Sequence, residues 1–154
     1  MSAEPVFDSE LAHTHFSVEC FNSTWELIDK KERTPDEDLM MLARAIASLW
    51  HWTQRPDCTP RNLSIGYWQV SRVCALIGDG TLARRYAEAC LRFSRDEGPF
   101  FLGYAYECLA RSARLSHAPD EALHFLAEAR RCAQLVEEAE EPIQLEQDLD
   151  SLAK

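Results

Sequence analysis

The segment YWQVSRVCAL at residues 67–76 recurs 39 residues later as YECLARSARL at residues 106–115. The match continues further along the chain, where ARRYAEACLR at 83–92 recurs as ALHFLAEARR at 122–131. Aromatic, small and arginine positions coincide in both pairs of segments. A period of this size is typical of stacked helical hairpins, in which each repeat buries its apolar face against the next one.

Proline and capping residues indicate where the predicted helices begin. Residues 34–37, Thr-Pro-Asp-Glu, have the pattern of a capping box with proline at the first helical position. Proline has the same place at 60, 99 and 119, and the Gly-Asp-Gly sequence at 78–80 ends one helix and admits another. These helix start and stop signals predict seven helices, at about 8–30, 35–55, 60–77, 81–96, 99–116, 119–138 and 142–152.

Short loops between long helices force neighbouring helices to run antiparallel. We therefore predict an all-α protein in which residues 1–154 form a single domain of stacked hairpins. The hairpins are expected at about 8–55, 60–96 and 99–138, with a C-terminal capping helix at about 142–152. Composition agrees, because alanine and leucine together number 37 whereas valine and isoleucine number 10.

The charge of the chain excludes some classes of partner and favours another. A formal net charge of −10 argues against a general affinity for nucleic acid or for an anionic membrane surface. The acidity lies at the two ends, whereas residues 60–133 hold ten arginines against eight acidic residues. The two clearest repeats are thus net positive, which favours anionic groups as ligands.

Cysteine usage and hydropathy point to the cytoplasm. The six cysteines form no C-x-x-C pair, and five lie in helical segments rich in alanine and leucine, where reduced cysteine packs as a small apolar residue. No segment reaches the roughly 18 consecutive apolar residues of a membrane span, and the first ~20 residues lack the pattern of a signal peptide. We expect a cytoplasmic protein without a membrane-bound part.

The repeat resembles the tetratricopeptide repeat, which places an aromatic, a large apolar and a small residue on its first helix and small residues with an aromatic on its second. The corresponding residues are Trp68, Val70, Ser71, Ala83 and Cys90 in one unit, and Tyr106, Leu109, Ala110, Ala122 and Ala129 in the next. Segments 24–30, 51–52, 68–73 and 104–107 also resemble a group of short uncharacterised bacterial proteins, which implies a bacterial origin and supplies no activity. The tetratricopeptide likeness implies a short right-handed solenoid whose first helices line a concave groove.

Transferring that groove to this chain gives the candidate binding residues. They are Trp25, Trp68, Arg72, Tyr104, Glu107, Arg111 and Arg114. Arg72 and Arg111, one repeat apart, have the forked donors that grip a carboxylate or a phosphate, and the aromatic rings offer flat apolar contact. The resemblance then implies a non-catalytic module for protein–protein interaction that binds a protein segment, a peptide or an anionic small ligand. A structural alternative stays open, because Glu107 and Arg111 are four residues apart and could pair with each other.

A second hypothesis is a small-molecule sensor or an enzyme with a pocket around His51, Trp52, Trp68 and Glu107. His51 also suits a simple packing role, because an imidazolium favourably meets the C-terminus of a helix. No glycine-rich phosphate loop or nucleophile motif is present, so we predict no catalytic residue and no cofactor. A homodimer is a further expectation, since a short stack leaves a terminal apolar face.

A remote alternative is a di-metal carboxylate site. Glu10 with His13 and Glu121 with His124 both fit Glu-x-x-His, the spacing that points two ligands inward in di-iron helical bundles. A complete site also needs a glutamate from each of two other helices. We therefore predict no metal.

Overall fold

The computed structural model describes residues 6–137 and 141–154, and the side chains of all of these except 141–143. Over these ranges the chain is all-α, without a strand, which confirms the predicted fold class. None of its helices combines the length and hydropathy needed to cross a lipid bilayer. The helices are α1 (Ser9–Ile28), α2 (Pro35–Thr53), α3 (Pro60–Leu76), α4 (Gly80–Ser94), α5 (Pro99–Leu115), α6 (Pro119–Gln134) and α7 (Glu141–Ala153).

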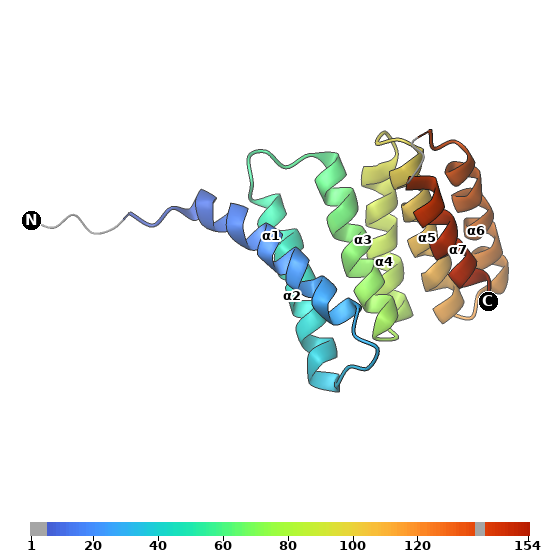
Figure 1. The fold of residues 1–154 in the computed structure, drawn as a ribbon, viewed down its shortest axis with the longest axis horizontal. Coiled ribbons are helices and arrows are strands. Elements are labelled where there is room, and N and C mark those ends of the chain that lie inside the picture. Colours follow the sequence, from blue (N-terminus) through green and yellow to red (C-terminus); the bar gives the residue numbers. More distant parts are fainter. Residues whose placement is uncertain (1–5, 138–140) are drawn as a thin grey trace, which may run out of the picture.

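The helices follow one another as hairpins α1/α2, α3/α4 and α5/α6, which stand side by side in a row (Figure 1). Helix α7 packs against α5 and α6 at the C-terminal end of this row. The odd-numbered helices also touch one another in sequence, α1 with α3, α3 with α5, and α5 with α7. They form one layer of the stack, and the residues predicted to line a groove lie mostly on it.

The predicted helix starts at 35, 60, 99 and 119 are confirmed, and capping explains two of them. The Thr34 hydroxyl accepts a hydrogen bond from the Glu37 amide at 3.2 Å, and the Glu37 carboxylate accepts from the Thr34 amide at 3.0 Å. Thr59 and Asn62 form the same reciprocal pair ahead of α3. The sixth helix ends at Gln134, four residues short of the predicted end at 138, which lies outside the described residues.

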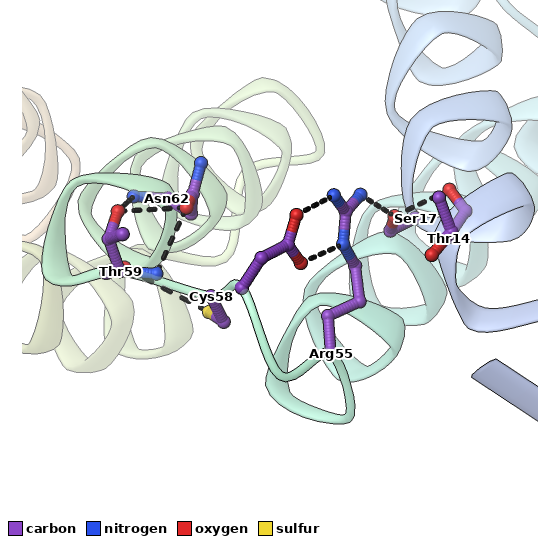
Figure 2. A network of polar contacts seen from close by, with 7 residues as sticks. Thr14, Ser17, Arg55, Cys58, Thr59 and Asn62 are labelled. Carbon is purple, nitrogen blue, oxygen red and sulfur yellow. Dashed lines mark hydrogen bonds and ion pairs between the residues drawn. The ribbon is translucent and has the colours of Figure 1, made fainter. Parts of the chain in front are cut away.

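The connection between α2 and α3 is fixed by Arg55 (Figure 2). Its guanidinium donates to both carboxylate oxygens of Asp57, at 2.8 and 2.6 Å, and to the Ser17 hydroxyl of α1 at 2.9 Å. The same group lies over the ring of Trp52, 3.8 Å from its centroid. One side chain thereby holds the loop, α1 and an aromatic ring of α2 in a fixed relation.

The core follows the hairpin stack, with one group of buried residues among α1 to α4 and another among α5 to α7. Small residues let the helices approach closely, and a Cβ added to the backbone at Gly66 would come within 2.9 Å of Leu49 Cδ1 on α2. At Gly103 the equivalent atom would come within 2.6 Å of Leu145 Cδ2 on α7. The fully buried large residues include Met41, Val70, Val73, Leu109, Leu145 and Leu149.

Candidate functional site

A pocket of about 440 Å³ opens on the layer formed by α1, α3, α5 and α7. Its volume lies within the range of small-molecule sites, and it is open to solvent on one side. Its aromatic walls are Phe21, Trp25, Trp68, Phe100, Phe101 and Tyr104. Its charged groups are Asp29, Arg72, Arg111 and Asp148. Five of the predicted groove residues, Trp25, Trp68, Arg72, Tyr104 and Arg111, are thus brought together.

Helical spacing explains why these side chains share the pocket. Trp68 and Arg72 are four residues apart on α3, and Tyr104 and Arg111 are seven apart on α5, so each pair lies on one face of its helix. Trp25 reaches the same space from the last turns of α1. The repeat therefore positions equivalent faces of successive hairpins toward a common opening.

The aromatic wall is a packed row of rings. Trp25 and Trp68 stack with centroids 5.8 Å apart and an interplanar angle of 26°. Trp68 meets Tyr104 edge to face at 5.6 Å, and Tyr104 meets Phe100 in the same manner at 5.1 Å. Rings that support one another in this way form a preorganised apolar surface.

Glu107 is the polar centre beneath this row. Its side chain is fully buried, and one carboxylate oxygen accepts a hydrogen bond from Trp68 Nε1 at 3.0 Å. The other oxygen accepts from Nε of Arg111, on the same helix. Glu107 lies below the pocket wall, where it orients an indole and a guanidinium that do line it. A buried carboxylate with two donors is well compensated, whereas one with a missing partner would be costly.

Arg72 differs from Arg111 in having no such partner. It lies half-buried in the pocket wall, and its guanidinium makes no hydrogen bond or ion pair within the part of the chain that the structure describes. Burial and the nearby Arg111 lower the pKa of Arg72, and the carboxylates of Glu107 and Asp148 partly offset this. Because arginine stays protonated in proteins, the pocket presents a charged, partly desolvated fork of donors.

Helix α7 contributes a carboxylate that the sequence analysis did not select. Asp148 accepts a hydrogen bond from the Tyr104 hydroxyl at 2.6 Å, which fixes the ring of Tyr104 in the wall. Burial and the Asp148 carboxylate raise the pKa of Tyr104, so it remains a neutral donor. One sequence pattern could have pointed to Asp148. The helical spacing of Leu145, Leu149 and Leu152 predicts the inner face of α7 and places Asp148 at the margin of that face.

The pocket also contains three phenylalanines that were not predicted, Phe21, Phe100 and Phe101. Phe21 precedes Trp25 by four residues, and Phe100 precedes Tyr104 by four, so both extend the predicted helix faces by one turn. Arg114, by contrast, is a predicted groove residue that does not line the pocket. It donates to the carbonyl oxygen of Leu152 and thereby attaches α7 to α5.

The four residues of the second hypothesis do not gather in one pocket. His51 pairs with His13 of α1, Nδ1 to Nδ1 at 2.8 Å, and its ring also lies near Trp50. Burial and the neighbouring His13 lower the pKa of His51, which favours its neutral form. Trp52 lines a separate hollow beside α1 and α3. Trp68 and Glu107 are hydrogen-bonded to each other, Trp52 lines the adjoining hollow, and His51 lines neither space.

The two Glu-x-x-His motifs are likewise far apart. Glu10 and His13 belong to α1 and Glu121 and His124 to α6, and these helices make no contact with each other. Glu121 instead pairs with Arg84 of α4 at 2.9 Å. Within residues 6–137 and 141–154, no three histidine, cysteine, aspartate or glutamate side chains are grouped as metal ligands.

The six cysteines are free thiols, and four of them are buried. Burial raises the pKa of Cys74 to about 11 and that of Cys132 in the same direction. The pKa values of the more accessible Cys20 and Cys58 are also raised by burial and by neighbouring carboxylates. These four thiols are therefore largely protonated at neutral pH, which makes them weak nucleophiles.

No protein-family model, curated protein or solved structure matches this chain. The likeness to the tetratricopeptide repeat and to short bacterial proteins accordingly stays a prediction.

Proposed function

We propose that the protein is a non-catalytic, tetratricopeptide-like binding module whose pocket takes a ligand with an anionic group next to an apolar part. The observation that carries the proposal is the guanidinium of Arg72, which faces the pocket without a protein partner among the described residues. A charged group removed from water gains most from a partner of opposite charge. The stacked rings of Trp25 and Trp68 beside it suit a flat or aliphatic portion of the same ligand.

Both an acidic peptide and an anionic small molecule satisfy this description. The carboxylates of Asp29 and Asp148 also line the pocket, so a ligand with a single negative charge is favoured over a highly charged one. The six free cysteines suit action in the reducing environment of the cytoplasm. No reaction is assigned to the pocket, and three of its titratable side chains hold its walls, because Tyr104 donates to Asp148 and Arg111 binds Glu107.

The proposal can be tested with phenylacetate and its neutral isostere phenylacetamide. Phenyl phosphate and the peptide acetyl-Phe-Glu-amide extend the panel to other anionic groups. Binding is followed through the indole N–H signals of Trp25 and Trp68 in NMR spectra of ¹⁵N-labelled protein. We expect the anionic probes to shift both signals, and phenylacetamide to bind at least about tenfold more weakly.

The variant Arg72→Met should reduce the affinity for phenylacetate at least about tenfold, because the charge-assisted hydrogen bonds are lost. Arg85→Met is the matched control, since Arg85 is an exposed arginine on α4 outside the pocket. The proposal is wrong if no anionic probe shifts the two indole signals. It is equally wrong if Arg72→Met binds phenylacetate as tightly as Arg85→Met does.

A further inference from the structure

A second hollow of about 200 Å³ adjoins the main pocket. Phe21 and Ile65 line both spaces, so the two meet across these side chains. Val18 of α1 and Trp52 of α2 also line the hollow. A ligand longer than the main pocket would thus pass over Phe21 and Ile65 toward Trp52.

The hollow is lined mainly by apolar side chains. The polar side chain in its lining is Asn62, whose Oδ1 accepts hydrogen bonds from the Thr59 amide at 3.0 Å and the Thr59 hydroxyl at 2.8 Å. Arg55, which covers Trp52, is bound to Asp57 by two hydrogen bonds. The route therefore offers a wall of aliphatic and aromatic carbon and no free cation from these residues.

The same route is poorly suited to a peptide backbone. The Ser64 hydroxyl, beside the main pocket, is paired with the Ser94 hydroxyl at 2.7 Å. The amide groups of an extended peptide need partners when they leave water, and an unpartnered amide costs roughly 1–3 kcal/mol on mutational scales. A hydrocarbon chain has no such requirement.

We infer that the ligand is a single-chain carboxylate whose head lies between Arg72 and Arg111 and whose hydrocarbon tail crosses Phe21 and Ile65 into the hollow beside Trp52. The inference rests on the proposed function, because it uses the same arginines for the head. Asp29 and Asp148 in the main pocket favour the single charge of a carboxylate over the double charge of a phosphate monoester.

The test is a series of saturated carboxylates from butanoate to dodecanoate, titrated below their micelle-forming concentrations. The indole signals of Trp25, Trp52 and Trp68 are followed by NMR, with exposed Trp50 as an internal reference. Affinity should rise about fourfold for each methylene buried, and the signal of Trp52 should begin to shift only with the longer chains. Decyl phosphate should bind more weakly than decanoate.

Val18→Asn places a polar group at the rim of the hollow, at a side chain that is 45% exposed and therefore tolerant of change. It should weaken decanoate at least about fivefold and leave butanoate unchanged. Leu123→Asn is the matched control, because Leu123 is an exposed apolar residue of α6 remote from both spaces, and it should alter neither affinity.

Three results would overturn the inference while leaving the proposed function intact. They are an affinity independent of chain length, equal binding of decanoate to Val18→Asn and Leu123→Asn, and a shift of Trp52 by acetyl-Phe-Glu-amide but not by decanoate. A different result strikes the proposed function itself, namely that no carboxylate of any length binds or that Arg72→Met binds butanoate as well as the unaltered protein.

Discussion

The hairpins α3/α4 and α5/α6 carry the same side chain at the same position with different consequences. Arg72 and Arg111 are one repeat of 39 residues apart. Four residues before Arg111 stands Glu107, which binds it, whereas four residues before Arg72 stands Trp68, which has no charge to offer. Trp68 instead donates its N–H to the same Glu107. The repeat sets the place of an arginine, and the residue one turn earlier decides whether it is structural or free.

The turns that end α3 and α5 also occupy equivalent positions but contain different residues. Both have the hydrogen bonds of a Schellman motif, Asp79 N to Cys74 O and Ala118 N to Ala113 O, each at 2.9 Å. The residue with positive φ is Gly78 at 85° in the first turn and His117 at 54° in the second. The next helix is capped by the Asp79 side chain in the first case and by no side chain at Ala118 in the second. The two turns thus share a backbone geometry, but the second one lacks the glycine and the side-chain cap that stabilise the first.

The largest expected effect separates the two arginines. Arg111→Met leaves the fully buried carboxylate of Glu107 without its cation, and we expect the free energy of unfolding to fall by about 3 kcal/mol. Arg72→Met removes no protein contact of this kind and should change it by less than about 0.5 kcal/mol. Urea unfolding followed by circular dichroism measures both values.

The double variant Glu107→Gln with Arg111→Met provides the control for this prediction. It removes both charges and keeps a carbonyl oxygen that can accept the Trp68 N–H, so it should recover much of the lost stability. Equal destabilisation by Arg72→Met and Arg111→Met would show that the two arginines have the same role. The distinction between the hairpins would then be wrong.

Much of the fold was predictable because its signals are local. Proline at 35, 60, 99 and 119 and the capping pairs fix where helices begin, and the 39-residue period fixes which helices are equivalent. The end of α6 was overestimated, because Leu135 and Val136 continue its apolar pattern where the α-helical hydrogen bonds give way to bonds to the carbonyls of Cys132 and Ala133, three residues earlier.

The candidate site was predictable only in part, for a physical reason. Trp68, Arg72, Tyr104 and Arg111 follow from helical spacing within the repeat. Asp148 does not, because α7 lies outside the repeat and its position depends on tertiary packing against α5 and α6. His51 and Trp52 were expected around the same pocket as Trp68, but Trp52 lines the adjoining hollow and His51 pairs with His13, contacts between helices that no single-helix pattern encodes.

The next effect in size concerns the turn residues. Gly78→Ala should destabilise the protein by about 1 kcal/mol, because φ is positive there and nothing within 4 Å would otherwise oppose a methyl group. His117→Gly should stabilise the protein by about 0.5 kcal/mol. This effect is smaller than that of Gly78→Ala, because histidine tolerates positive φ better than most residues do. Thermal unfolding in the same buffer compares them. A loss of stability in His117→Gly would mean that the imidazole makes a contribution that outweighs backbone strain.

Effects of about the same size concern the start of the second helix in the hairpins α3/α4 and α5/α6. Asp79 has φ −91° and ψ 87°, and Ala118 has φ −110° and ψ 76°, so an aspartate at 118 would find nearly the same backbone. Ala118→Asp should therefore stabilise the protein by about 0.7 kcal/mol, and Asp79→Ala should destabilise it by about 1 kcal/mol. The gain is the smaller value because Asp120 and Glu121 already place negative charge in the first turn of α6. Ala118→Asn separates the capping hydrogen bond from the charge repulsion by Asp120 and Glu121. It keeps the hydrogen bond without the negative charge, so its melting temperature should match or exceed that of Ala118→Asp. If neither substitution raises the melting temperature, the missing cap is not what lowers the stability of the turn before α6. The two hairpins would then share their backbone geometry but not the energetics of helix capping.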